Sequence, residues 1–336
     1  MSRRAALGLA PSVGVVIALT AVGWVTWTAT ARATARIGEA ELRAYPPIVL
    51  VWGPCCEGTQ AGDLYVVRGD GSEPRRLRHW GPFGVEGKAY GAYLALWSHD
   101  RSSIALALAV TFNGDPDTAV HLISKNGRSL RRLSEWCRLL ETWSPDGTKL
   151  FHSNFACTGY ERLRSVPVSG GRSTVVPIAR AWNPRIVEPD WSRDGRIAAI
   201  GSSRDLDTFS NGIVTMNAEG RKLTHLTRGD DSDTTWSPDG RAILFTHAVS
   251  NAPNVYVVGA DGRGLRRLTS DGRSWAMGWS PDGRKILFLR PGENRAKPKK
   301  SGMDLWVMDS SGKGQERLPF NRTGWDVLSA DWGRAS

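Results

Sequence analysis

The side chains best suited to recognition chemistry are tryptophans that have arginines near them in the sequence. Aromatic rings and guanidinium groups are enriched among the residues that carry binding energy at protein interfaces. Each of these tryptophans lies ahead of another tryptophan that recurs along the chain. We predict that the set forms a binding surface, and the alternative is that each ring packs inside the fold. The set is Trp80, Trp136, Trp182, Trp275 and Trp325, with Arg138, Arg185, Arg273 and Arg322 nearby.

The sequence contains none of the short motifs that would identify a familiar catalytic centre. A Gly-x-Ser-x-Gly nucleophile elbow, a phosphate-binding loop and a His-Glu-x-x-His helix are all absent. The histidines occupy unrelated places in the repeat described below, so they do not recur as a ring of ligands would. We therefore predict no enzyme activity, and the alternative is a polysaccharide lyase or hydrolase-like enzyme with its site at a channel mouth. The histidines are His79, His99, His121, His152, His225 and His247.

Two acidic clusters could hold a hard cation, because Ca²⁺ prefers carboxylate and carbonyl oxygens. Residues 229–233 include three aspartates, and residues 204–207 include two. Polar loops are the simpler interpretation of both clusters. We predict no cofactor, and Ca²⁺ is the alternative.

The four cysteines are suited to disulfides rather than to a metal, since no Cys-x-x-Cys spacing occurs. Cys137 precedes and Cys157 follows two strands that are expected to form a hairpin. The start of one strand then meets the end of the other, within disulfide reach. We predict a Cys137–Cys157 disulfide, whereas Cys55 and Cys56 either form a vicinal bridge or pair elsewhere.

A repeat must position all of these side chains, and its clearest copy is Trp-Ser-Pro-Asp-Gly at residues 143–147. Related copies begin at Trp97, Trp191, Trp236 and Trp279, and a truncated one includes Trp332. These tryptophans are 43 to 53 residues apart, a period typical of repeat architectures. Pro, Asp and Gly favour a tight turn, and apolar runs on either side read as strands. Four short strands per period predict the blade of a β-propeller.

The order of these runs also resembles a known repeat. A Trp-Ser-Pro-Asp-Gly turn is followed by an apolar strand such as 285–289, a Tyr-Val-Val strand such as 256–258, and an Arg-Arg-Leu-Thr run such as 266–269. This order resembles the WD40-like repeat of TolB-type propellers over roughly residues 46–333. The resemblance implies a fold, and it does not specify a function.

The two ends of the repeat region complete one another. Strand-like runs at 48–52, 64–67 and 75–77 lack a first strand, whereas residues 330–332 form a first strand with nothing after it. Joined, they make a sixth blade and remove the exposed edges of an open sheet. We predict an all-β, six-bladed β-propeller, closed by pairing of N- and C-terminal strands in one blade and preceded by an N-terminal hydrophobic helix. The expected domains are a membrane anchor or signal segment at 1–33, a spacer at 34–46 and the propeller at 47–336.

The N-terminal segment has the composition of a membrane span. Residues 5–31 contain no charged side chain, which is long for a signal peptide and sufficient for a span. Arg3 and Arg4 orient it, and Trp24 and Trp27 suit the far interface. We predict a single-pass cell-membrane protein with the propeller outside the cytoplasm. Secretion after signal cleavage is the alternative, because 29–31, 31–33 and 33–35 are plausible cleavage sites and residues 2–7 partly match a twin-arginine signal.

The net charge of +11 concerns association rather than fold. The basic residues are scattered over several blades without a nucleic-acid-binding motif, so we predict no nucleic-acid partner. We expect a monomeric, non-catalytic binding or scaffold protein. It would engage an envelope protein or an anionic envelope polymer through one face of the ring, and the membrane through residues 5–31.

Overall fold

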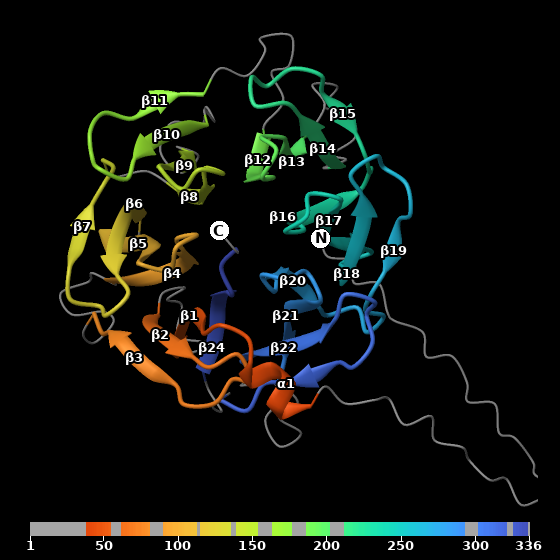
Figure 1. Cartoon of the computed structure of the whole chain (residues 1–336), viewed down its shortest axis with the longest axis horizontal. Coiled ribbons are helices and arrows are strands. Elements are labelled where there is room, and N and C mark those ends of the chain that lie inside the picture. The colour runs from red at the N-terminus through yellow and green to blue at the C-terminus, as the bar shows by residue number, and fades with distance from the viewer. Residues whose placement is uncertain are drawn as a thin grey trace, which may run out of the picture. The chain divides into compact units, whose positions relative to one another are not determined.

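The structure is a computed structural model, and it shows six four-stranded antiparallel sheets arranged as a ring around a central axis (Figure 1). The ring confirms the predicted all-β, six-bladed propeller. The first strand of each sheet lies nearest the axis and the fourth lies at the rim (Figure 1). The structure describes residues 38–54, 62–80, 90–112, 115–135, 139–153, 163–176, 186–201, 212–292, 302–320 and 325–334.

The blades are numbered here in chain order, starting from the one that holds both ends of the ring. Blade 1 contains β24 (Trp325–Asp331), β1 (Ile48–Pro54), β2 (Asp63–Val67) and β3 (Arg75–Arg78). Blade 2 contains β4 (Tyr90–Trp97), β5 (Ser103–Phe112), β6 (Asp115–Ser124) and β7 (Leu130–Arg132). Blade 3 contains β8 (Leu139–Trp143), β9 (Lys149–Ser153), β10 (Arg164–Pro167) and β11 (Thr174–Val175).

The other three blades repeat the same order from the axis to the rim. Blade 4 contains β12 (Ile186–Trp191), β13 (Ile197–Gly201), β14 (Gly212–Met216) and β15 (Thr224–His225). Blade 5 contains β16 (Asp230–Trp236), β17 (Ala242–Val249), β18 (Ala252–Gly259) and β19 (Arg266–Arg267). Blade 6 contains β20 (Trp275–Trp279), β21 (Lys285–Pro291), β22 (Met303–Asp309) and β23 (Glu316–Arg317).

Blade 1 closes the ring as the sequence predicts. β24 pairs antiparallel with β1, so that Leu50 faces Ala330 and Val51 faces Ser329. β1 in turn pairs with β2. The strand that is last in the sequence thus becomes the innermost strand of the first blade, and every blade has four strands.

The hydrophobic core is divided among the spaces between neighbouring blades. In β1, Ile48 and Leu50 pack against blade 6, whereas Val49 and Val51 pack against blade 2. This is the period of two that a strand buried on both faces requires. Six buried clusters fill the six spaces, so each blade is stabilised by its two neighbours.

The repeated turn is held by its aspartate, which explains the Ser-x-Asp-Gly spacing. In the copy at 143–147, Asp146 Oδ1 accepts hydrogen bonds from Ser144 Oγ (2.6 Å) and from the Thr148 backbone N–H (3.0 Å). These bonds hold the pKa of Asp146 below its usual value. Gly147 takes the left-handed conformation (φ +68°) that this turn needs. The turn residues are therefore architectural.

A short helix, α1 (Glu39–Arg43), fastens the segment before β1 to the ring. Its Leu42 is buried in the core between blades 1 and 6. Its Glu41 forms an ion pair with the buried Lys285 of β21 (2.6 Å), and Arg43 pairs with Asp70 of blade 1 (2.6 Å). The predicted spacer thus includes ordered structure from residue 38 onward.

Several predictions fall on residues that the structure does not describe. They are the hydrophobic helix within residues 1–33, the Cys137–Cys157 disulfide, the pairing of Cys55 and Cys56, and the acidic cluster at 204–207. Within the described ranges, α1 is the one helix, and nothing there is both long and apolar enough to cross a membrane.

Candidate functional site

A cavity of about 620 Å³ occupies the centre of the ring, and all six first strands line it. At one end it reaches Ser153 and Val187, which lie beside the starts of first strands. At the other end it reaches His99 and Pro238, which belong to the repeated turns. A single cavity therefore receives side chains from every blade.

Each first strand places its side chains in this cavity by means of a β-bulge. The pairing between first and second strands shifts register once in every blade, which leaves one or two residues of the inner strand without a partner in the ladder. A bulge re-aims side chains and interrupts the ladder. All of the unpaired residues line the cavity: Tyr93, Glu141, Glu188, Pro189, Asp233, Thr234, Met277 and Leu328.

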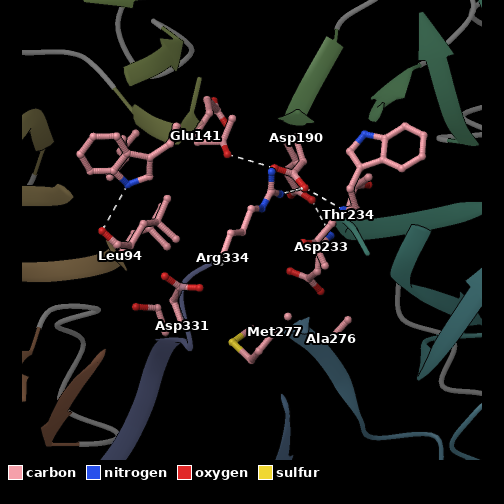
Figure 2. A pocket seen from close by; sticks show the side chains of 18 of the residues that line it. Leu94, Glu141, Asp190, Asp233, Thr234, Ala276, Met277, Asp331 and Arg334 are labelled. Carbon is pink, nitrogen blue, oxygen red and sulfur yellow. Dashed lines mark hydrogen bonds and ion pairs between the residues drawn. The ribbon is translucent and has the colours of Figure 1, made fainter. Parts of the chain in front are cut away.

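The bulge residues divide the cavity into two chemically different sides. Glu141, Glu188 and Asp233 come from the consecutive blades 3, 4 and 5. Met277, Leu328 and Tyr93 come from blades 6, 1 and 2, which are also consecutive. Figure 2 shows the labelled Glu141 on the side of Asp190, across the cavity from Met277, and it shows Asp233 between Asp190 and Met277. The site therefore suits a ligand with a cationic part and an apolar part.

Two of the acidic residues are in direct contact. Glu188 Oε2 accepts a hydrogen bond from the backbone N–H of Asp233 (2.5 Å). Glu188 is exposed to the cavity but surrounded by protein, and this burial, together with the nearby Asp233, raises the pKa of Glu188 to about 7. Burial also raises the pKa of Asp233. Close to neutral pH, the pair therefore holds less than its full negative charge.

Both members of this carboxyl pair have an unusual backbone. Glu188 (φ +51°) and Asp233 (φ +55°) lie in the left-handed region, which non-glycine residues rarely occupy. Each such residue costs of order 1 kcal/mol or more and persists only where the surroundings enforce it. Holding these two carboxyl groups toward the same cavity therefore lowers the stability of the fold.

An arginine from the opposite blade closes one end of the cavity. After β24 the chain turns to the centre of the ring (Figure 1). There the Arg334 guanidinium donates to Asp190 Oδ2 and to the backbone carbonyl of Trp191, both in β12 (Figure 2). Asp190 is buried and also accepts from the Trp236 N–H (2.7 Å) and the Thr142 hydroxyl (3.0 Å). One carboxylate therefore joins blades 3, 4 and 5 to the segment after β24.

The position of Arg334 depends on the two residues before it and on Asp331. Asp331 accepts from the Trp97 N–H of blade 2 (2.7 Å) and from the Gly333 N–H (2.9 Å). Gly333 has φ +69°, and a Cβ added there would lie 2.7 Å from the Trp97 Cβ. Only glycine fits this approach. The turn into the cavity is thus built into the sequence at this position.

Two hydroxyl groups beside the cavity have no hydrogen-bond partner among the described residues. They are Tyr93 Oη in blade 2 and Thr234 Oγ1 in blade 5. Thr234 is 8% exposed. A buried polar atom without a partner is rare in folded proteins and costs about 1–3 kcal/mol. Both hydroxyls therefore lack a partner that a ligand could supply, and each oxygen is itself covered by neighbouring atoms.

The predicted binding tryptophans that the structure describes pack within the fold. Trp80 packs against the core between blades 1 and 2, and Trp275 and Trp325 pack against the core between blades 6 and 1. Arg273 is exposed just ahead of β20. None of these four residues lines the cavity. The remaining members of the set, Trp136, Trp182, Arg138, Arg185 and Arg322, lie outside the described residues, and the binding surface that the set was expected to form stays a prediction.

The acidic cluster at 229–233 is not the loop that we expected. Residues 230–233 belong to β16, because the strand begins earlier than the apolar pattern indicates. Asp231 points away from the cavity to His247 (2.6 Å), and Asp233 points into it. No group of three or more His, Cys, Asp or Glu side chains in the described ranges could hold a metal ion. Ca²⁺ at residues 204–207 stays untested, because those residues are not described.

A closed six-bladed ring with one central cavity defines a β-propeller with a single axial site. The chain belongs to the TolB β-propeller family, because the model described as TolB beta propeller domain matches residues 142–318, more than half of the sequence. This confirms the family that the repeat resembles.

Solved structures agree with this fold. A candidate TolB from Agrobacterium tumefaciens is 19% identical with a TM-score of 0.56, and the match covers 82% of this chain and 89% of that one. A chain of the nidogen/laminin complex is 11% identical, also with a TM-score of 0.56, covering 84% and 97%. The oligogalacturonate lyase of Vibrio parahaemolyticus is 13% identical with a TM-score of 0.46, covering 81% and 73%. At these identities the first two matches show the fold alone, and the third carries no argument.

Proposed function

We propose that this propeller is a non-catalytic extracytoplasmic binding protein that engages an envelope protein through its central cavity. Membership of the TolB propeller family supports a binding role. The observation that carries the proposal is the two-sided cavity, in which six bulges present carboxylates from three blades and apolar groups from the other three. The uncharged segment at 5–31 supports the extracytoplasmic placement.

The charge of the cavity favours a protein partner over an anionic polymer. A polyanion entering the cavity would meet Glu141, Glu188 and Asp233, and like charges at close range repel. A protein segment can instead supply a basic side chain and apolar groups together. The net charge of +11 belongs to the chain as a whole, so an anionic polymer would bind to the outer surface rather than in the cavity.

A lyase or hydrolase-like activity is the second candidate, because one cavity carboxyl has a pKa near neutrality. A carboxyl with a raised pKa beside a second carboxyl is the usual arrangement for general acid–base catalysis. Here, however, Glu188 Oε2 already accepts a hydrogen bond from the Asp233 N–H, and the Asp190 carboxylate already accepts from three donors. These bonds compete with a substrate for both carboxyl groups. Turnover of acidic and neutral polysaccharides that Glu188→Gln abolishes would establish the enzyme. Equal, background turnover by both proteins would exclude it for those substrates.

The proposal is tested by filling the cavity without changing the outer surface. Met277→Arg places a long cationic side chain on the apolar side of the cavity, facing the carboxylates. Val175→Arg makes the same charge change at the rim, where Val175 is 44% exposed on β11. Both variants are compared with the natural chain in capture from envelope extract, after circular dichroism has established that they fold.

We expect one or more envelope proteins to be retained by the natural chain and by Val175→Arg, and to be lost with Met277→Arg. If a folded Met277→Arg variant retains the same proteins in the same amount, the cavity is not the binding site. If no protein is retained by any of the three, the proposed function fails.

A further inference from the structure

We propose that the Glu188–Asp233 carboxyl pair receives an arginine side chain presented by the partner protein. This inference rests on the proposed function and specifies the chemistry of the segment that enters the cavity. Four observations carry it: an uncompensated acidic pair, an internal arginine that already uses the neighbouring position, an apolar wall opposite, and two hydroxyls without partners.

The first observation is the missing counter-charge. Across the described residues, no salt bridge joins Glu188 or Asp233 to a cation. Their hydrogen bonds come from the Asp233 N–H to Glu188, and from the hydroxyls of Thr246 (2.7 Å) and Ser232 (3.1 Å) to Asp233. Two adjacent carboxyls without a cation repel each other and are costly to keep. A cation placed between them would be held strongly.

The second observation is the occupied position next to this pair. Arg334 enters the cavity from blade 1 and binds Asp190, which lies two residues after Glu188 on β12. The Asp190 carboxylate also accepts from the Trp236 N–H, three residues after Asp233 on β16. Blade 4 thus binds one guanidinium already, through a carboxylate that blade 5 also contacts. The carboxyl pair places further acceptors closer to the starts of the same two strands.

The third and fourth observations concern the rest of the ligand. Met277, Leu328 and Tyr93 form an apolar wall across the cavity, against which the methylene groups of an arginine can pack. The hydroxyls of Thr234 and Tyr93 can accept from guanidinium N–H groups or bond to the peptide backbone. The volume of about 620 Å³ falls within the range typical of pockets that enclose a small ligand.

Arginine fits this site better than lysine or a divalent ion. The guanidinium is planar and carries five N–H donors in a fork that matches two carboxylate oxygens. It is also less strongly hydrated than an ammonium, which lowers the cost of leaving water. A divalent ion would need a closer group of ligands than any that the described residues bring together.

The test uses the whole chain and three short peptides. Each is twelve residues of glycine and serine with a single central arginine, lysine or citrulline. Citrulline keeps the shape of arginine and removes its charge. Binding is followed by the fluorescence of the tryptophans, four of which line the cavity: Trp97, Trp143, Trp236 and Trp279. The chains compared are the natural one, Glu188→Gln, Asp233→Asn and the control Glu219→Gln, an exposed residue of blade 4.

We expect the arginine peptide to bind the natural chain and Glu219→Gln with equal Kd. The natural chain should bind the citrulline peptide at least tenfold more weakly than the arginine peptide, and the lysine peptide with an intermediate Kd. The Glu188→Gln and Asp233→Asn variants should each bind the arginine peptide at least tenfold more weakly than the natural chain does. Equal binding of arginine and citrulline peptides by the natural chain overturns the inference, and this comparison requires no variant to fold. Binding of the arginine peptide that survives in Glu188→Gln and Asp233→Asn also overturns it.

The outcome is separable from that of the proposed function. If Met277→Arg abolishes capture of an envelope protein but the natural chain does not distinguish arginine from citrulline, only the inference fails. If arginine is recognised but no envelope protein is retained, the cavity is a guanidinium site and the proposed function fails.

Discussion

Arg334 should contribute to stability through one buried carboxylate, and this can be measured with a double-mutant cycle. Asp190 is 5% exposed and accepts from Arg334, from the Trp236 N–H and from the Thr142 hydroxyl. Removing one partner of a buried ion pair typically costs about 3–5 kcal/mol. The Arg334 side chain keeps 23% of its exposure, so we expect about 2 kcal/mol for Arg334→Gln.

Asp190→Asn should cost slightly more, about 3 kcal/mol, because its amide group can accept on only one atom where the carboxylate accepts on two. The double variant should cost about 2 kcal/mol less than the sum of the single changes, since the two side chains share one interaction. Urea denaturation followed by tryptophan fluorescence measures all four proteins. Glu219→Gln, at an exposed position of the same blade, serves as the control. A coupling energy below about 0.5 kcal/mol, the size of an exposed pair, would refute the view that Arg334 is fixed in the cavity.

Three further predictions concern the same region. Folding raises the pKa of Glu188, so the stability that this carboxyl contributes is present below about pH 4.5 and is lost as the pH rises to about 7. The difference in urea midpoint between the natural chain and Glu188→Gln should therefore change between these two pH values. A constant difference would contradict this prediction. Gly333→Ala should lower the free energy of unfolding by about 2 kcal/mol or more, because the added Cβ would clash with Trp97. Gly264→Ala is the control, because Gly264 has a similar φ and open space around it, and it should cost about 1 kcal/mol. Equal shifts in melting temperature would show that the close approach is absent. Trp325→Ala should lower stability by about 2–3 kcal/mol, since its ring lies 5.0 Å from that of Trp52, and an unchanged unfolding midpoint would mean that this tryptophan is free to bind a partner.

The fold could be predicted from the sequence because its signals are local and repeated. The Trp-Ser-Pro-Asp-Gly turn requires only neighbouring residues, as the bonds from Ser144 and Thr148 to Asp146 illustrate. Five copies fix the number of blades, and the missing first strand before Ile48 requires the pairing that β24 supplies. Each of these inferences depends on residues that are adjacent in the chain or on a simple count.

The residues that line the cavity could not be predicted, because the bulges shift their positions relative to the repeat. Tyr93 lies four residues before its repeat tryptophan, Glu188 lies three before, and Glu141 lies two before. No fixed position in the repeat therefore marks a cavity residue. Asp233 attracted attention as part of an acidic cluster, but its partner Glu188 comes from the neighbouring blade. Arg334 lies beyond the last recognisable strand and carried no signal.

The tryptophans ahead of each repeat illustrate the opposite problem. Their residue type suits binding, but aromatic rings are also the largest contributors to a core. In Trp80, Trp275 and Trp325 the second role is visible, because each packs against a cluster between two blades. Sequence alone gives the same signal for both roles.

The most direct test of binding through the cavity is site-specific photo-crosslinking from inside it. Tyr93 is replaced by benzoylphenylalanine, which keeps an aromatic ring at a position that lines the cavity, and Val175 at the rim receives the same group as the control. After irradiation in the envelope, we expect a protein adduct from position 93 whose crosslinked peptide contains an arginine, and none of this adduct from position 175. Adducts that form only from position 175 would contradict the account.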